Sequence, residues 1–324
     1  MSLQNFVIST LMRLAQRASA KLSAEHRFRR NRRFLAADRS KPGPSVQIKP
    51  DQLAGLPVEW VTPRSLAQAD TAPICLYLHG GAFVMGGLNS HRDLAAQLAQ
   101  RAQIRLLMLD YRLAPEHPFP AALDDALAVY RALLAQGIPA QRLLLGGDSA
   151  GGNLALGTAQ AIQAQSLPLP AALVLFSPWL DLTDRSPSRL ANAATDVMLS
   201  QPLLDEAAAL YAPGLPLDDV RLSPLFGPLA GLPPCLLIAS RAEILIDDAR
   251  RLQQQMLAAG GEVELLEWAN TPHAFPVLAR YLPEGRAALD QTARFIWQHL
   301  AQPEFTRSSA RLRIDPTTHL GETF

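Results

Sequence analysis

Short, mainly apolar runs alternate with helical stretches along most of this sequence. The apolar runs are 74–79, 104–110, 142–147, 172–177, 235–240 and 263–268. The stretches with helical spacing are 91–102, 121–135, 150–164, 247–259 and 286–300. A strand that is apolar at every position is buried on both faces, and strands that alternate with helices form a parallel sheet with helices on both sides. The sequence therefore predicts an α/β fold around a mostly parallel central sheet.

Composition limits the classes of protein to which this chain of 324 residues can belong. Apolar residues make up 48% of it and charged residues 18%, which allows a large core and excludes general disorder. The 30 basic and 29 acidic side chains give a net charge of +1, so no overall field favours nucleic acid. No run of about 18 uninterrupted apolar residues occurs, so we expect no membrane span. Cys75 and Cys235 lie in two of the apolar runs, which indicates core thiols and a reduced, cytoplasmic setting.

The first 45 residues follow a different pattern. Apolar residues recur there at helical spacing instead of in one block, which argues against a secretory signal; they are Leu3, Phe6, Val7, Leu11 and Leu14. The stretch from Arg13 to Lys41 is rich in Arg and Lys and holds only two acids, Glu25 and Asp38. We expect a helix on the body of the protein with a solvated basic face, because the first turns hold few basic residues. A basic amphipathic helix at a membrane surface is the alternative.

Polar and proline-rich segments divide the rest of the chain. Residues 45–50 and 57–63 have the pattern of short alternating strands. Residues 181–230 contain several prolines and a helical piece at 201–211, and an insertion at this point would lie over the carboxyl ends of the strands. We therefore expect a helical cap segment at 1–45, a main domain at 46–302 with a cap insertion at about 181–230, and a loose polar tail at 303–324.

Residues Gly147-Asp148-Ser149-Ala150-Gly151 match the pattern G-x-S-x-G between an apolar run and a helical stretch. So tight a strand-to-helix turn forces the serine into strained dihedrals, and glycines flank it because a Cβ there would collide with neighbouring backbone. The Ser149 hydroxyl then lies at a helix N-terminus, where N–H groups favour a developing negative charge. Ser149 is therefore a candidate nucleophile; a glycine-rich turn with an incidental serine is the alternative, which the strand–turn–helix context disfavours.

A second glycine-rich loop, His79-Gly80-Gly81-Ala82, directly follows an apolar run. Acyl transfer needs backbone N–H groups aimed at the oxyanion, and glycines let the backbone approach a substrate closely. We expect the donors to be Gly80, Gly81 and Ala150, the residue after the nucleophile. His79 is expected to fix the loop by hydrogen bonds.

A nucleophilic serine needs a base and an acid that orients the base. Of the seven histidines, His273 lies in a loop after the last apolar run, and residues after strand carboxyl ends converge on the site in such folds. The order serine, acid, histidine is the one that α/β-hydrolases use. Glu243 is the first acid after the run 235–240 and is the candidate acid. Asp247 and Asp248 are assigned as caps of the following helix.

Together these segments resemble the hormone-sensitive-lipase-like esterases, a family of α/β-hydrolases. The matching segments follow the family's order and are HGGA at 79–82, DYRLAPEHPFPAAL at 110–123, GDSAGG at 147–152, EILIDD at 243–248 and PHAF at 272–275. Alanine replaces the family's glycine at 82 and 274, so residue 82 is left out of the expected donors. Glu243 followed by Ile244 replaces the family's usual Asp-Pro.

The resemblance implies an α/β-hydrolase fold with a helical cap and the activity of a serine carboxylesterase. Members of the family favour short to medium acyl chains, need no cofactor, and work through an acyl-enzyme, here with a Ser149–His273–Glu243 triad. Arg112 and Glu116 are implied to make buried polar contacts that support the oxyanion loop.

Other activities can use the same triad. A lactonase, an amidase or a deacetylase is an alternative, because cap and pocket set the specificity. A non-catalytic ligand receptor is disfavoured, because all three triad positions have candidates. A lipase that acts at a membrane interface is a third alternative, and the basic N-terminal stretch is the feature that suggests it. We expect a small ester substrate, no metal, no cofactor and no nucleic-acid partner, and the sequence leaves a homodimer open.

Overall fold

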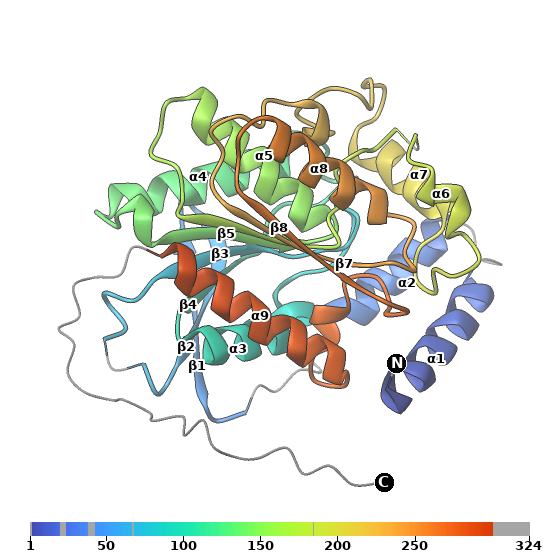
Figure 1. The fold of residues 1–324 in the computed structure, drawn as a ribbon, viewed down its shortest axis with the longest axis horizontal. Helices are drawn as coiled ribbons and strands as arrows, with labels where there is room; N and C mark the ends of the chain where they lie inside the picture. Colours follow the sequence, from blue (N-terminus) through green and yellow to red (C-terminus); the bar gives the residue numbers. More distant parts are fainter. Residues whose placement is uncertain (1, 20–23, 38–42, 67, 184, 301–324) are drawn as a thin grey trace, which may run out of the picture.

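A central sheet runs through the molecule and has eight strands within the described residues (Figure 1). The computed structural model describes residues 2–19, 24–37, 43–66, 68–183 and 185–300. The strand order is β1-β2-β4-β3-β5-β6-β7-β8. The pairs β1–β2 and β2–β4 are antiparallel, and all other neighbours are parallel. The strands are β1 (Val46–Leu53), β2 (Leu56–Pro63), β3 (Ile74–Leu78), β4 (Arg105–Leu109), β5 (Leu143–Asp148), β6 (Ala172–Phe176), β7 (Cys235–Ser240) and β8 (Val263–Trp268).

Helices cover both faces of the sheet. Helices α3 and α9 pack together on one face, and α4, α5 and α8 cover the other, while α1, α2, α6 and α7 gather at one end (Figure 1). The helices are α1 (Leu3–Ser19), α2 (Ala24–Ala36), α3 (Leu88–Ala102), α4 (Ala121–Ala135), α5 (Ala150–Ala164), α6 (Ser188–Ala191), α7 (Gln201–Tyr211), α8 (Ile246–Ala258) and α9 (Pro283–His299). None of them, over the described residues, is long and apolar enough to cross a membrane.

Successive residues of each inner strand supply two different cores. In β3, Ile74, Leu76 and Leu78 pack on the side of α4, α5 and α8, whereas Cys75 and Tyr77 pack on the side of α3 and α9. This alternation follows from the strand period of two and explains why the inner strands are mainly apolar. The predicted two-sided burial is confirmed for β3, β5, β6 and β7, whereas β8, at the edge of the sheet, is only partly buried. Both cysteines are free and fully buried.

The elements α4, α5, α7, β7 and β8 have the predicted bounds, and the ends of the other predicted elements lie within three residues of those expected. The expected polar alternation near the N-terminus is wrong for β2, where residues 58–61 are all buried. Val58 and Trp60 face one core and Val61 the other, and Glu59 is buried because it pairs with Arg92 of α3 at 2.8 Å. The predicted tail at 303–324 lies outside the described residues.

The insertion after β6 is tied to the first turn of α8. The Asp248 carboxylate accepts hydrogen bonds from the backbone N–H groups of Leu180 and Asp181 and from the Ser186 hydroxyl. Asp247 accepts one from the N–H of Ser188. The assignment of these two aspartates as helix caps is therefore wrong, since both bind the inserted segment and neither caps α8.

Candidate active site

Ser149 occupies a sharp turn between β5 and α5. Its backbone has φ 54° and ψ −121°, the strained geometry that the sequence predicts. A Cβ on Gly147 would collide with the Gly151 carbonyl, and a Cβ on Gly151 would collide with the Leu78 carbonyl. Both glycines are therefore required for the turn to pass between its neighbours. The turn leaves Ser149 at the N-terminus of α5, where its side chain is 7% exposed.

The structure brings His273 and Glu243 together as the sequence predicts. His273 Nδ1 and Glu243 Oε2 are 2.6 Å apart, and both side chains are buried. The other carboxylate oxygen of Glu243 accepts the N–H of Ser240 at 2.9 Å. Within the described residues, His273 Nε2 makes no hydrogen bond, so this nitrogen is not bonded to the Ser149 hydroxyl. Catalytic hydrogen bonds often tighten only when substrate binds.

Nearby charges set the pKa of His273. Burial alone would lower its pKa, because it disfavours the charged imidazolium. The hydrogen bond and charge of Glu243, together with the charges of Asp196 and Asp148, outweigh burial and raise the pKa of His273 above its usual value. The site therefore stabilises the imidazolium form that a base acquires when it takes a proton from serine.

Backbone contacts in the loop at 79–82, the expected oxyanion loop, contradict one of the three expected donors. The N–H of Gly80 donates to Asp148 Oδ1 at 3.1 Å, so it is engaged and does not face a substrate. No hydrogen bond from the N–H of Gly81, Ala82 or Ala150 is found within the described residues. Gly81 has φ 128°, and a Cβ there would collide with the Met85 carbonyl. Ala82 adopts φ 53°, which an alanine tolerates at some cost.

Asp148 links this loop to the serine turn. Its carboxylate accepts hydrogen bonds from the Tyr77 hydroxyl at 2.9 Å and from the Gly80 N–H, and it lies 3.1 Å from His91 Nε2. Burial would raise its pKa, but the contacts with His91 and Tyr77 outweigh burial and lower it. Sequence reasoning assigned no role to His91, which lies in α3, within the predicted helical stretch 91–102. His79 stacks on Tyr111, and burial lowers its pKa to about 3, so it is neutral.

The inserted segment holds the Glu243 loop from the other side. Asp196 Oδ2 accepts the N–H of Ile244 at 2.9 Å, and Asp196 Oδ1 accepts those of Met198 and Leu199. Asn192 Nδ2 donates to the carbonyls of Arg241 and Glu243 at 2.9 and 2.8 Å. Thr195 Oγ1 lies 2.9 Å from the Ala242 carbonyl. Sequence reasoning missed all three residues, because nothing local distinguishes them from other polar residues of the insertion.

Two residues implied to support the oxyanion loop lie elsewhere. Arg112 pairs with Asp125 at 2.6 Å and is 44% exposed, and Glu116 is 58% exposed. The implied buried contacts are therefore wrong. Arg32 of α2 supports this region instead, since its guanidinium donates to the carbonyls of Val84 and Ala114 and pairs with Glu116.

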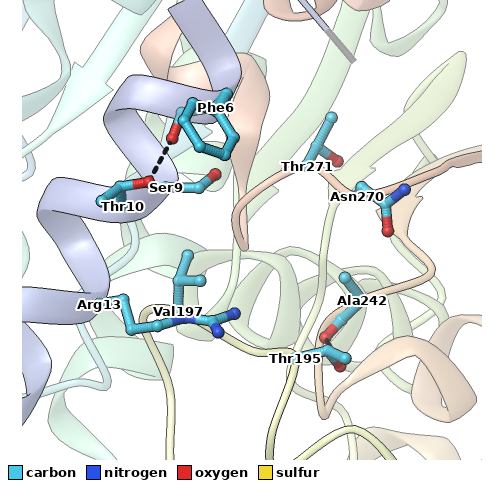
Figure 2. Close-up of a pocket in the computed structure, with 9 residues that line it drawn as sticks. All are labelled: Phe6, Ser9, Thr10, Arg13, Thr195, Val197, Ala242, Asn270 and Thr271. Atoms are coloured by element: carbon cyan, nitrogen blue, oxygen red, sulfur yellow. Dashed lines mark hydrogen bonds between the residues drawn. The ribbon is translucent and has the colours of Figure 1, made fainter.

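A pocket of about 310 Å³ lies between α1 and the loops that precede Glu243 and His273 (Figure 2). Phe6, Ser9 and Arg13 project into it from α1 (Figure 2). The opposite wall contains Thr195, Val197, Ala242, Asn270 and Thr271. The lining includes sequence neighbours of Glu243 and His273 but neither of these residues nor Ser149, so the pocket lies beside them. No group of three or more His, Cys, Asp or Glu side chains within the described residues could hold a metal.

Comparisons with known proteins agree with this geometry. The sequence matches the family described as alpha/beta hydrolase fold over residues 75–277. An esterase of Acinetobacter venetianus is 39% identical over 253 residues, which cover 78% of this chain and 82% of that protein. An acetyl-hydrolase of Streptomyces hygroscopicus is 42% identical over 238 residues, which cover 74% of this chain and 78% of that protein.

Solved structures of esterases are similar to this chain over nearly its whole length. The crystal structure of an esterase from the bacterial hormone-sensitive lipase family matches with a TM-score of 0.85 and 35% identity, covering 93% of this chain and 99% of that one. Shared fold and shared sequence therefore point to the same group of enzymes. The chain belongs to the α/β-hydrolase family, as a bacterial esterase of the hormone-sensitive-lipase-like group that hydrolyses carboxylic esters.

Proposed function

We propose that this esterase cleaves short- to medium-chain acyl esters with Ser149 as nucleophile, His273 as base and Glu243 as the orienting acid. The observation that carries the proposal is the buried 2.6 Å contact between Glu243 and His273 Nδ1, which leaves Nε2 as the ring nitrogen without a hydrogen bond among the described residues. A carboxylate that binds Nδ1–H fixes the tautomer in which Nε2 can accept a proton. The strained Ser149 turn supports the assignment of the nucleophile.

The reaction follows from these roles. His273 Nε2 takes the Ser149 hydroxyl proton as the serine oxygen attacks the ester carbonyl. The negative charge that develops on the carbonyl oxygen is bound by the N–H groups of Gly81, Ala82 and Ala150, for which the described part of the chain shows no other acceptor. The imidazolium then gives its proton to the leaving alcohol, and an acyl-enzyme remains. Water, deprotonated by His273, attacks this ester, and the acid leaves as Ser149 regains its proton.

A cap over the site would limit the acyl chain. We assign the cap to residues 1–45 and the insertion at about 181–230, as the sequence suggests. Two contacts support this assignment: Gln16 of α1 donates to the Leu199 carbonyl, and Arg32 of α2 binds the segment beside the oxyanion loop. The similar acetyl-hydrolase of Streptomyces hygroscopicus is named for a short acyl group, which favours short chains here.

Hydrolysis of p-nitrophenyl acetate, butyrate, octanoate and laurate tests the proposal. We expect the turnover to be highest for the acetate or the butyrate and to disappear in Ser149→Ala. Ser166→Ala, at an exposed turn after α5, is the matched control and keeps wild-type rates. Activity that survives in Ser149→Ala would refute the nucleophile, and faster turnover of an anilide or a lactone would refute ester preference.

Two further expectations belong to the same proposal. The enzyme needs no metal or cofactor, so dialysis against a chelator should leave its activity unchanged. Its location in the cytoplasm is suggested by the two free, buried cysteines. Fractionation of cells that express the protein would test the location.

A further inference from the structure

Helix α1 contacts the protein through a mixed polar and apolar side, on which Ile8 packs against the core, and turns a second, apolar side toward solvent. The side chains that are buried or partly buried are Asn5, Ile8, Ser9, Met12 and Gln16. Asn5 is fully buried and donates to the Asn270 carbonyl at 3.0 Å, and Gln16 donates to the Leu199 carbonyl at 2.8 Å. These hydrogen bonds fix the rotation of the helix on the body.

The outward side of α1 carries an apolar stripe, formed by Leu3, Val7, Leu11 and Leu14. Their spacing of four, four and three residues places them on one face of the helix. They are 76%, 46%, 60% and 57% exposed. An amphipathic helix of a globular protein normally packs such a stripe against the core, and a contiguous exposed apolar patch marks an interaction site. The helix lies on the body with exposed arginines, as expected, but its apolar stripe faces solvent as well.

The stripe is also where exposed apolar side chains concentrate. Of the twelve large apolar residues that are exposed within the described part of the chain, six lie in α1 and α2. The other six are scattered from Leu190 to Trp297. Single exposed apolar residues are normal on protein surfaces, whereas a cluster on one helix indicates a partner.

The same two helices carry an excess of positive charge. Their sequences contain seven arginines and one glutamate, in a chain with 30 basic and 29 acidic residues. Outside them, acidic side chains therefore outnumber basic ones. Arg17 lies on the flank of the stripe and is exposed, and Arg29, Arg30 and Arg33 are exposed on α2. Both helices lie at the same end of the molecule (Figure 1).

We propose that the apolar stripe and its arginines dock the enzyme on an anionic lipid surface. A helix with Leu and Phe on one face and arginines beside it lies in the plane of a membrane interface, and anionic lipids attract its charges. A second copy of the chain suits this surface less well. A symmetric dimer would bring together two copies of a surface that carries an excess of positive charge.

Vesicle sedimentation tests the proposal without using catalysis. The probes are phosphatidylcholine vesicles with and without phosphatidylglycerol. We expect the wild-type protein to bind the anionic vesicles, to bind neutral ones at least about tenfold more weakly, and to be released by salt. Val7→Ser/Leu11→Ser should weaken binding by about 100-fold. Arg17→Glu should weaken it by about 20-fold, and Arg17→Lys should retain it.

A matched double variant separates the stripe from general surface hydrophobicity. Val220→Ser/Leu257→Ser removes two apolar residues of similar exposure, 45% and 54%, and should bind vesicles as the wild type does. Thermal unfolding of each variant checks that the fold is intact. Absence of binding to anionic vesicles, equal binding to neutral ones, or equal loss in the control variant would each overturn the proposal. A dimer that the Val7/Leu11 variant dissociates, without vesicle binding, would show that a second copy covers the stripe.

Discussion

The turn at Ser149 and the loop at Glu243 both belong to the candidate site, but different contacts hold them in place. The turn at Ser149 is fixed by close backbone contact, since Gly147 and Gly151 leave no room for a side chain. The loop at Glu243 is fixed by side chains of the inserted segment: Asn192 and Thr195 donate hydrogen bonds to its carbonyls, and Asp196 accepts one from its backbone N–H. Steric contact tolerates almost no change, whereas a set of polar contacts can lose one member and keep the others. The two halves of the site should therefore fail in different ways when mutated.

The largest effect on activity is expected at the acid itself. Glu243→Gln removes the charge that stabilises the imidazolium and the acceptor that fixes the tautomer of His273. We expect kcat for p-nitrophenyl butyrate to fall by about 1,000- to 10,000-fold, with little change in stability. Glu267→Gln, which breaks an exposed pair with Arg250, is the control and should keep full activity. A loss below tenfold in Glu243→Gln would mean that another carboxylate orients His273.

A substitution in the Ser149 turn should lower activity by destabilising the fold. Gly151→Ala drives a methyl group into the Leu78 carbonyl, which belongs to the neighbouring strand and cannot move aside cheaply. We expect the free energy of unfolding to fall by about 3 kcal/mol or more, and activity to fall with it. Denaturant unfolding measures this change.

Gly157→Ala on the same helix is the control for this substitution. A Cβ there would meet only the Leu123 side chain, at 3.5 Å. Since alanine favours helix over glycine, this variant should gain up to about 1 kcal/mol. Similar losses in both variants would mean that the Gly151 contact is not what fixes the turn.

The same contrast explains what could be predicted from the sequence. The Ser149 turn was predictable because its steric requirement leaves a local signature of glycines between a strand and a helix. His273 and Glu243 were predictable because the loops after parallel strands meet at one edge of the sheet. The sheet itself was predictable because burial on both faces makes the inner strands mainly apolar.

Contacts between distant segments left no such signature. Asp196 and Arg32 act on loops far away in the chain, and only the folded backbone shows that their partners are carbonyls and N–H groups. The role of Gly80 was misassigned because its N–H could face either the substrate or Asp148, and the sequence does not distinguish them. The orientation of α1 could not be predicted either, since periodicity predicts an apolar face but not whether that face lies toward the protein or toward solvent.

The smallest effect on activity should come from weakening the polar contacts between the inserted segment and the Glu243 loop. Asp196→Asn removes a charge that raises the pKa of His273 and turns an amide toward N–H groups that Asp196 accepts. We expect kcat/KM at neutral pH to fall by about tenfold, because Asn192 and Thr195 still hold the loop. Base catalysis needs neutral His273, so a lower pKa should extend activity to lower pH, and the acid limb of the kcat/KM profile should shift downward. Asp219→Asn, in the same insertion but away from His273, should leave the limb in place. A limb that does not move, or that moves to higher pH, would show that Asp196 acts on the loop without acting on the base.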